Sequence, residues 1–400
     1  MELTELCKSA KEVSRQIGNL DTNTKNEVLR AAAEAIVAHT EEIIRENEKD
    51  LARGRENHMP EGLLDRLMLN PSRMEQMAEG LRQVADLADP IGEVLSMKKR
   101  PNGLMIGKKR VPLGVVGMIY EARPNVTVDA FALCFKTGNA VILKGGSDAI
   151  SSNIVIVSVL QEVLETHGIP RAAVSLIEDT SRETAAAFMK MNEYVDVLIP
   201  RGGAGLIRAC VERAKVPVIQ TGTGICHIYV DATAETEEAL AILENAKASR
   251  PSVCNAAEVC LVHEAIAPDF LPKLDAALFT ARKERGLTPV VFRCSEEALP
   301  YMPHGTAAGP EDFDTEFLDY ILAVRVVKST EEAIAHIAAH STHHSEAILS
   351  RSEESIRAFT AAVDSAAVYV NASTRFTDGG EFGLGCEMGI STQKLHARGP

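Results

Sequence analysis

The chain has 400 residues, 46% of them apolar and 24% charged, which is typical of a globular protein with two or three domains. Its formal net charge is −14, and this excludes a general nucleic-acid partner, because such proteins need a basic face. No apolar run approaches the ~20 residues that cross a bilayer, and the N-terminal segment is too polar for a signal peptide. We therefore expect a cytoplasmic protein with neither a nucleic-acid nor a membrane partner.

Helices are expected first, over residues 1–89. The ranges 24–54 and 71–90 show the clearest helical spacing of apolar residues. In the range 94–114, two basic arms flank Pro101-Asn102-Gly103, a turn sequence that predicts a β-hairpin.

From residue 114, short apolar runs alternate with helical ones, which is the βαβ pattern of a doubly wound parallel sheet. Its strands are expected at 114–120, 139–145, 173–177 and 194–199. Residues 229–370 repeat the alternation, so we expect a second α/β domain. Its strands are expected at 258–264, 287–293, 320–328 and 365–371. The tail from Asn371 is rich in Gly and polar residues, which suggests loops that line a site.

The chain has eight cysteines with neither a CxxC pair nor a zinc spacing, so free thiols in a reducing compartment are expected. Cys254 lies in a short polar segment between an expected helix and an apolar strand. A thiol there can be exposed and held by backbone, as a nucleophile requires. Spacing alone leaves a buried structural thiol as the alternative. Cys260, inside the strand, is expected in the core.

Two glycine-containing turns follow expected strands and are candidate phosphate-binding loops. Lys144 to Ser147 offers backbone amides, an ammonium group and a hydroxyl, which suit a nucleotide phosphate or ribose. Arg201, Gly202 and Gly203 form the second turn, which matches neither GxGxxG nor the P-loop pattern. Each is also compatible with an ordinary turn.

Three further features leave alternatives open. Asn125 stands at the start of an expected helix, either as a cap or with its amide in a cleft. The segment TGTG (221–224) is compatible with a turn or with the floor of an active site. His336 and His340 have the spacing of metal ligands on a helix, with two more histidines after them. No Glu or Cys completes a zinc pattern, so surface or structural imidazoles are favoured and no metal is expected.

Five segments together carry a family resemblance. They are YEARPNVTVDA (120–130), LIPRGGAGL (198–206), RPSVCN (250–255), VKSTEEAIAHIAAHSTHHSEAI (327–348) and VYVNASTRFTDGGEFGLG (368–385). They resemble the aldehyde dehydrogenase superfamily and, more closely, its gamma-glutamyl phosphate reductase branch, the glutamate-5-semialdehyde dehydrogenases. The resemblance extends over the whole chain and marks the histidine segment as a family feature.

The resemblance implies an enzyme that uses NADPH to reduce L-glutamate 5-phosphate to L-glutamate 5-semialdehyde and phosphate. This is the second step of proline biosynthesis from glutamate. Cys254 falls on the family's nucleophile, which forms a thioester with the substrate. Asn125 falls on its oxyanion-binding asparagine, and losing one such donor typically costs about 10²–10³ in rate.

The resemblance also assigns NADPH contacts. Lys144 and Ser147 fall where the family binds the adenosine ribose or its 2′-phosphate. Gly202 and Gly203, with Arg201, fall at the pyrophosphate, and Glu316 falls near the glutamate that holds the nicotinamide ribose.

One departure from the aldehyde dehydrogenase pattern concerns the residue that would activate water. Hydrolytic aldehyde dehydrogenases carry a glutamate base where this chain has Gln220. An amide cannot take a proton from water, so the thioester is expected to be reduced and not hydrolysed. For the substrate anions, Arg123, Arg375 and the loop 378–380 are candidates, with a structural salt bridge as the alternative for either arginine.

The expected fold is aldehyde dehydrogenase-like. An NADPH-binding domain covers 1–228, with an oligomerisation hairpin at 94–114 inserted. A catalytic domain with Cys254 covers 229–365, and 366–400 returns to the first domain and adds an oligomerisation tail. A homodimer or homotetramer and functional coupling to glutamate 5-kinase are expected. The rivals are an aldehyde dehydrogenase that makes a free acid and a nucleotide-binding protein without catalysis.

Overall fold

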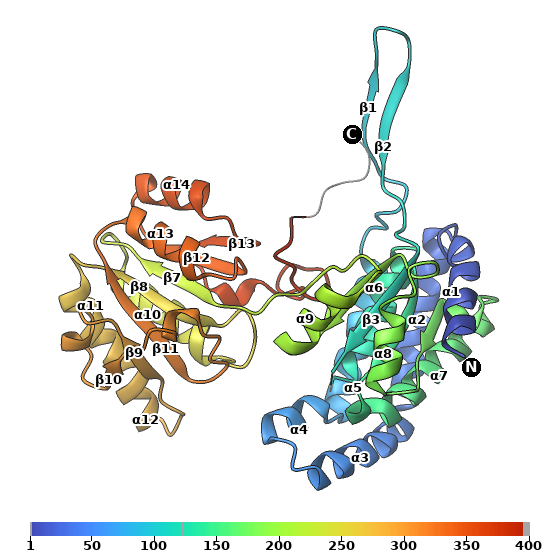
Figure 1. Ribbon diagram of the computed structural model, residues 1–400, viewed down its shortest axis with the longest axis horizontal. Helices are drawn as coiled ribbons and strands as arrows, with labels where there is room; N and C mark the ends of the chain where they lie inside the picture. The colour runs from blue at the N-terminus through green and yellow to red at the C-terminus, as the bar shows by residue number, and fades with distance from the viewer. Residues whose placement is uncertain (1, 122, 395–400) are drawn as a thin grey trace. The chain divides into compact units, whose positions relative to one another are not determined.

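The computed structural model describes residues 2–121 and 123–394, so the end of the predicted tail, 395–400, lies outside the described residues. The chain divides into two compact units (Figure 1). The first unit is Met1–Thr221 with Gly383–Gly389, and the second is Gly222–Phe382 with Ile390–Pro400. Each unit is described by itself below.

The first unit begins with five helices, as expected for this region. They are α1 (Leu3–Ile17), α2 (Thr22–Ala38), α3 (Thr40–Glu56), α4 (Glu61–Leu67) and α5 (Pro71–Asp86). The prediction of one helix over 24–54 is wrong, because the chain leaves the helical conformation at His39 (φ −95°, ψ 14°). The buried side chains Ile36, Ile43 and Asp50 keep a seven-residue spacing across the break. The helical spacing of buried residues therefore continues through His39 and did not indicate that the helix ends there.

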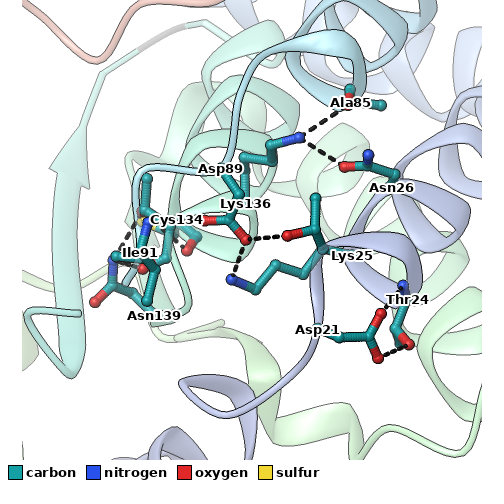
Figure 2. Close-up of polar contacts among 12 residues, drawn as sticks. Asp21, Thr24, Lys25, Asn26, Ala85, Asp89, Ile91, Cys134, Lys136 and Asn139 are labelled. Carbon is teal, nitrogen blue, oxygen red and sulfur yellow. Dashed lines mark hydrogen bonds and ion pairs between the residues drawn. The ribbon is translucent and has the colours of Figure 1, made fainter. Parts of the chain in front are cut away.

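A buried polar cluster ties these helices to the rest of the first unit (Figure 2). Lys25 on α2 forms an ion pair of 2.8 Å with Asp89, and both side chains are buried. Asp89 also accepts the backbone N–H of Ile91 at the root of the hairpin. Lys136 on α6 (Asn125–Lys136) donates to Asn26 and to the carbonyl of Ala85. These buried ammonium groups are thus paired or hydrogen-bonded, as burial requires.

The predicted hairpin is confirmed: β1 (Val94–Lys99) pairs antiparallel with β2 (Met105–Lys109). Gly103 in the turn has φ +87°, a conformation that favours glycine. The ribbon extends away from the helices of its own unit (Figure 1). Its apolar side chains are about half exposed, namely Val94, Leu95, Met97, Met105 and Ile106.

The sheet of the first unit has four parallel strands in the order β5-β4-β3-β6. They are β3 (Val115–Tyr120), β4 (Ala140–Gly145), β5 (Val174–Leu176) and β6 (Val197–Arg201). Helices α2, α5, α6 and α7 (Ile150–Thr166) share the core on one face. Helices α1, α8 (Arg182–Phe188) and α9 (Ala204–Arg213) share the core on the other. The doubly wound prediction is confirmed.

The strand order predicts where a ligand would bind. Strands β4 and β5 follow β3 to one side, whereas β6 lies on the other side of β3. Ligands in such sheets bind outside the carboxyl ends of the strands where the order reverses. Here those ends are Tyr120 and Arg201, which are register partners.

The second unit contains a seven-stranded parallel sheet in the order β10-β9-β11-β8-β7-β12-β13. Its strands are β7 (Cys226–Val230), β8 (Ala257–His263), β9 (Val291–Cys294), β10 (Gly305–Ala307), β11 (Ile321–Val327), β12 (Ser345–Leu349) and β13 (Ala367–Val370). Its longer helices are α10 (Thr236–Ala248), α11 (Ala267–Asp275), α13 (Thr330–His340) and α14 (Glu353–Ala362). The second α/β domain is confirmed.

Sequence analysis missed β7, β10, β12 and α14. Strand β12 is buried at all five positions although it begins Ser345-Glu346. Glu346 accepts the backbone N–H of His227 at 2.6 Å and the hydroxyl of Ser341. These partners compensate the burial of the carboxylate, so a polar pair of residues stands inside a core strand.

Among the described residues, the stretch Ser147–Thr166 is long and apolar enough to cross a membrane. It contains α7, whose residues Ile156, Leu160 and Leu164 belong to the core of the first unit. Its most apolar window is 50% buried, and core helices of globular proteins meet the same criterion. It is therefore weak evidence for a membrane partner.

Candidate active site

The predicted nucleophile lies where several loops of the second unit meet. Cys254 lies between α10 and the start of β8, Gly224 lies just before β7, and Glu316 precedes β11. These positions are all at the amino ends of neighbouring or near-neighbouring parallel strands. Loops from distant parts of the sequence therefore converge on Cys254.

Cys254 differs from the other cysteines in its exposure. It is half-buried, whereas the other seven are buried. Burial raises the pKa of each of those seven thiols above its usual value. A thiol held in its protonated form is a poor nucleophile, so exposure singles out Cys254.

The backbone of Cys254 lies directly against Gly224. A Cβ added to Gly224 would lie 1.5 Å from the carbonyl oxygen of Cys254, so only glycine fits here. The N–H of Gly224 donates to Glu316 at 2.7 Å, and the thiol of Cys226 donates to the Cys254 carbonyl at 3.2 Å. The open question about TGTG is thus answered, because its last glycine forms the floor under Cys254.

Asn255, the residue after the predicted nucleophile, is also held in place by hydrogen bonds. Asn255 is buried, and its amide donates to the carbonyls of Arg375 and Thr377 at 3.2 and 2.9 Å. Thr374 donates to the Asn255 carbonyl at 2.7 Å. The loop after β13 therefore clamps the Cys254 loop from the other side.

Arg375 is brought to this site by the same clamp. Its guanidinium donates to the side-chain oxygen of Asn255, and its Nε is buried without a hydrogen-bond partner among the described residues. Burial and the neighbouring Arg250 lower the pKa of Arg375, while Asp378 and Cys254 act in the opposite direction. A cation with an unused donor next to the nucleophile fits an anionic ligand.

A buried ion pair that sequence analysis missed supports the loop of Glu316. Lys247 on α10 donates to Glu258 on β8 at 2.5 Å, and neither side chain is exposed. Glu258 also accepts the N–H of Leu318, two residues after Glu316. Burial raises the pKa of Glu258 to about 7 and also raises that of Glu316. The pair involves partners 11 residues apart on different elements, which no sequence spacing identifies.

In the first unit, Asn125 is the first residue of α6, and its side chain is exposed. Its amide donates to Asp129 at 3.1 Å, one turn further along the helix. Arg123, two residues earlier, is half-buried on the same unit, so the two candidate substrate arginines belong to different units. Gln220 lies in the first unit and Cys254 in the second.

The second glycine turn already holds an anion. The carboxylate of Glu121, at the end of β3, accepts the N–H of Gly203 at 3.0 Å before α9 begins. A Cβ on Gly202 would lie 2.7 Å from that carboxylate. Arg201 pairs with Glu387 at 3.5 Å. This turn lies where the strand order reverses, and its glycines leave room for the Glu121 carboxylate. Binding of a phosphate at this turn stays a prediction. Sequence analysis gave no role to Glu121.

The first glycine turn places its two candidate residues differently. Lys144, the penultimate residue of β4, is 3% exposed and donates to the carbonyl of Gly145 at 3.2 Å. Burial lowers its pKa, an effect that Asp179 opposes. Ser147 is exposed at the start of a short 3-10 turn before α7.

The surroundings of the histidine cluster indicate a structural role. His336 is buried and packs edge-on against Phe313 and His227 at 5.3 and 5.4 Å between ring centroids. Burial lowers the pKa of His336 to about 3 and that of His344 to about 4. Within residues 2–121 and 123–394, no group of three or more His, Cys, Asp or Glu side chains is arranged to hold a metal ion.

Comparison with known proteins identifies relatives over almost the whole chain. The model of the aldehyde dehydrogenase family matches residues 1–292. A gamma-glutamyl phosphate reductase of Streptococcus pneumoniae strain JJA is 58% identical over 97% of this chain and 92% of its own length.

Solved structures of the same kind of protein agree. The crystal structure of gamma-glutamyl phosphate reductase from Thermotoga maritima has a TM-score of 0.94 and 44% identity, covering 100% of this chain and 95% of that one. The enzyme of the same name from Saccharomyces cerevisiae has a TM-score of 0.52 and 28% identity, covering 96% of this chain and 95% of that one.

Proposed function

Because the chain belongs to the gamma-glutamyl phosphate reductases, a branch of the aldehyde dehydrogenase family, we propose that it reduces L-glutamate 5-phosphate with NADPH. The products are L-glutamate 5-semialdehyde and phosphate, which makes this the second step of proline biosynthesis from glutamate. The observation that carries the proposal is Cys254, the only one of the eight cysteines that is not buried, on a loop fixed by Gly224 and Asn255.

The reaction starts with the Cys254 thiolate. Its sulfur attacks the acyl carbon of the substrate, the carbon–oxygen bond to the phosphate breaks, and phosphate leaves with the bonding electrons. The amide of Asn125 and the backbone N–H of Cys254 stabilise the oxyanion of the tetrahedral intermediate. NADPH, when bound, supplies the hydride that reduces the resulting thioester. The aldehyde is then released as Cys254 leaves as a thiolate.

Residues of the first unit are suited to hold NADPH. The Glu121 carboxylate at the N–H of Gly203 shows that this helix start accepts an anion, so we place the pyrophosphate there, beside Arg201. Lys144 and Ser147 are assigned to the adenosine ribose or its 2′-phosphate, and the choice of NADPH over NADH rests on the family resemblance. Glu316 of the second unit is assigned to the nicotinamide ribose. The first unit is thus the cofactor-binding part and the second the catalytic part.

Substrate anions are assigned to Arg375 and Arg123. The Nε of Arg375, which is buried and has no hydrogen-bond partner within the described part of the chain, supports the first assignment. Gln220, in place of a glutamate base, supports reduction over hydrolysis of the thioester. An aldehyde dehydrogenase that makes a free acid would need that base.

The hairpin supports assembly. The hairpin exposes more apolar surface than a solvated two-stranded ribbon needs. Five of its apolar residues are about half exposed, namely Val94, Leu95, Met97, Met105 and Ile106. We infer that it packs in a homodimer or homotetramer. A cytoplasmic location and functional coupling to glutamate 5-kinase follow from the proposed pathway step.

The test runs the reaction backwards. Purified protein with glutamate 5-semialdehyde and NADP⁺ should form NADPH only when inorganic phosphate is added. NADPH formation without phosphate, with glutamate as product, would instead show the rival hydrolytic aldehyde dehydrogenase. No NADPH formation under either condition would contradict both.

A further inference from the structure

The side chain of Asn125 has a neighbour that restricts how it can turn. Asn125 and Asp129 are four residues apart on α6, so they lie on one face of the helix. The distance from the amide nitrogen of Asn125 to the carboxylate of Asp129 is 3.1 Å. An ionised carboxylate only accepts hydrogen bonds, so it selects the amide orientation that turns the NH₂ group toward it. The second N–H of that NH₂ group then remains on the exposed side.

Groups from two other places in the first unit surround Asp129. The thiol of Cys386 donates to it, and the Arg201 cation and the Glu387 carboxylate lie close enough to influence it. Burial raises the pKa of Asp129 to about 6, Cys386, Asn125 and Arg201 act against that rise, and Glu387 adds to it. Cys386 and Glu387 belong to the segment Gly383–Gly389, which returns to this unit from the end of the chain.

We propose that Asp129 is a positioning residue that fixes the amide of Asn125 with its NH₂ group available to the substrate oxyanion. The proposal rests on the oxyanion role of Asn125 given above. An amide released from this contact would present its carbonyl oxygen part of the time, and an oxygen lone pair repels an oxyanion. Asp129 thus acts through Asn125 and touches neither substrate nor cofactor.

Four variants test this role by the kcat of NADPH-dependent reduction. Asn125→Ala should lower kcat by about 10²–10³, the usual cost of a lost oxyanion donor. Asp129→Leu keeps the branching at Cγ but removes the acceptor, and should lower kcat by roughly tenfold with KM for glutamyl phosphate nearly unchanged, as for an interaction made in the transition state. The double variant should be no slower than Asn125→Ala, because the two residues act as one unit.

The conservative variant separates positioning from folding. Asp129→Asn keeps an oxygen acceptor but cannot titrate, so it should retain most of the activity near neutral pH. The ratio of its kcat to that of the wild type should rise as pH falls through about 6, where Asp129 becomes protonated. Asp86→Asn is the matched control, because Asp86 is 70% exposed in a surface ion pair, and its ratio should stay flat with pH.

Two results would overturn the proposal in distinguishable ways. If Asp129→Leu is folded and as fast as the wild type while Asn125→Ala is slow, Asp129 does not position Asn125. If Asn125→Ala itself keeps full kcat, the oxyanion role fails and the positioning role with it. If Asp129→Leu does not fold, a flat kcat ratio for Asp129→Asn between pH 5 and 7, the range of roughly one unit on either side of the expected titration, contradicts the proposal by itself.

Discussion

A single methyl group added at Gly224 should displace Cys254, the proposed nucleophile, because the two backbones are in direct contact. The Cβ of Gly224→Ala would lie 1.5 Å from the carbonyl oxygen of Cys254 and 2.4 Å from its carbonyl carbon. An ordinary van der Waals contact begins at 3.4 Å, so the two backbones must separate by about 1.9 Å. Both partners are main chain, so no side-chain rotation relieves the clash.

The expected effects follow from this displacement. A shift of about 1 Å in an active site can cost about 10² in rate, so kcat should fall by at least about 10². Overpacking of this kind typically costs about 1–3 kcal/mol of stability. The assays are kcat with glutamyl phosphate, the rate of Cys254 alkylation by iodoacetamide, and the urea midpoint of unfolding.

The matched control is Gly222→Ala in the same segment. Its Cβ meets only the side chain of Thr392, at 3.4 Å, so kcat and stability should stay close to those of the wild type. If Gly224→Ala were within about threefold of the wild type in kcat, with unchanged alkylation of Cys254, the close packing against Cys254 would not support catalysis.

Three further predictions concern other parts of the protein. Lys247→Met leaves Glu258 buried without its partner and should lower the free energy of unfolding, measured in urea, by about 3–5 kcal/mol. The double variant Lys247→Met, Glu258→Leu should recover part of that loss. No recovery would refute the pairing argument. His336 and His344 have pKa values lowered to about 3 and about 4. The free energy of unfolding should therefore be at its maximum above pH ~6.5, and below that pH it should fall by about 1.4 kcal/mol per pH unit for each histidine. His336→Asn and His344→Asn should each flatten this pH dependence of the unfolding midpoint. Gln220→Glu should introduce phosphate-independent formation of glutamate from the semialdehyde, measured by product analysis, and an unchanged requirement for phosphate would count against the role of Gln220.

The sequence predicts those parts of the fold in which local pattern and burial agree. The apolar runs at β3 and β4 are buried throughout, and the strands stand where the runs predict them. Strand β12 was missed because its carboxylate at Glu346 is satisfied by His227 and Ser341, which are 119 and 5 residues away along the chain. Burial of such a strand depends on partners that only the folded chain brings together.

The same distinction holds for the site. The local segment of Cys254, a polar turn before an apolar strand, made an accessible thiol possible but left a buried one open, and the family resemblance selected it. Glu121 could not be named from the sequence, because its contact with Gly203 depends on the fold, and Asp129 was not named although it contacts the nearby Asn125. The Gly203 contact spans 82 residues. The Asp129 contact is local, and its i, i+4 spacing from Asn125 is the signal that could have revealed it.

The most direct test of the central claim compares two cysteine variants in NADPH oxidation, with glutamyl phosphate supplied by a glutamate kinase, ATP and glutamate. Cys254→Ser should show no turnover. Cys260→Ser, which alters a buried thiol in the adjacent strand, should retain turnover close to that of the wild type. Full activity of Cys254→Ser would contradict a thioester on Cys254 and, with it, the proposed mechanism.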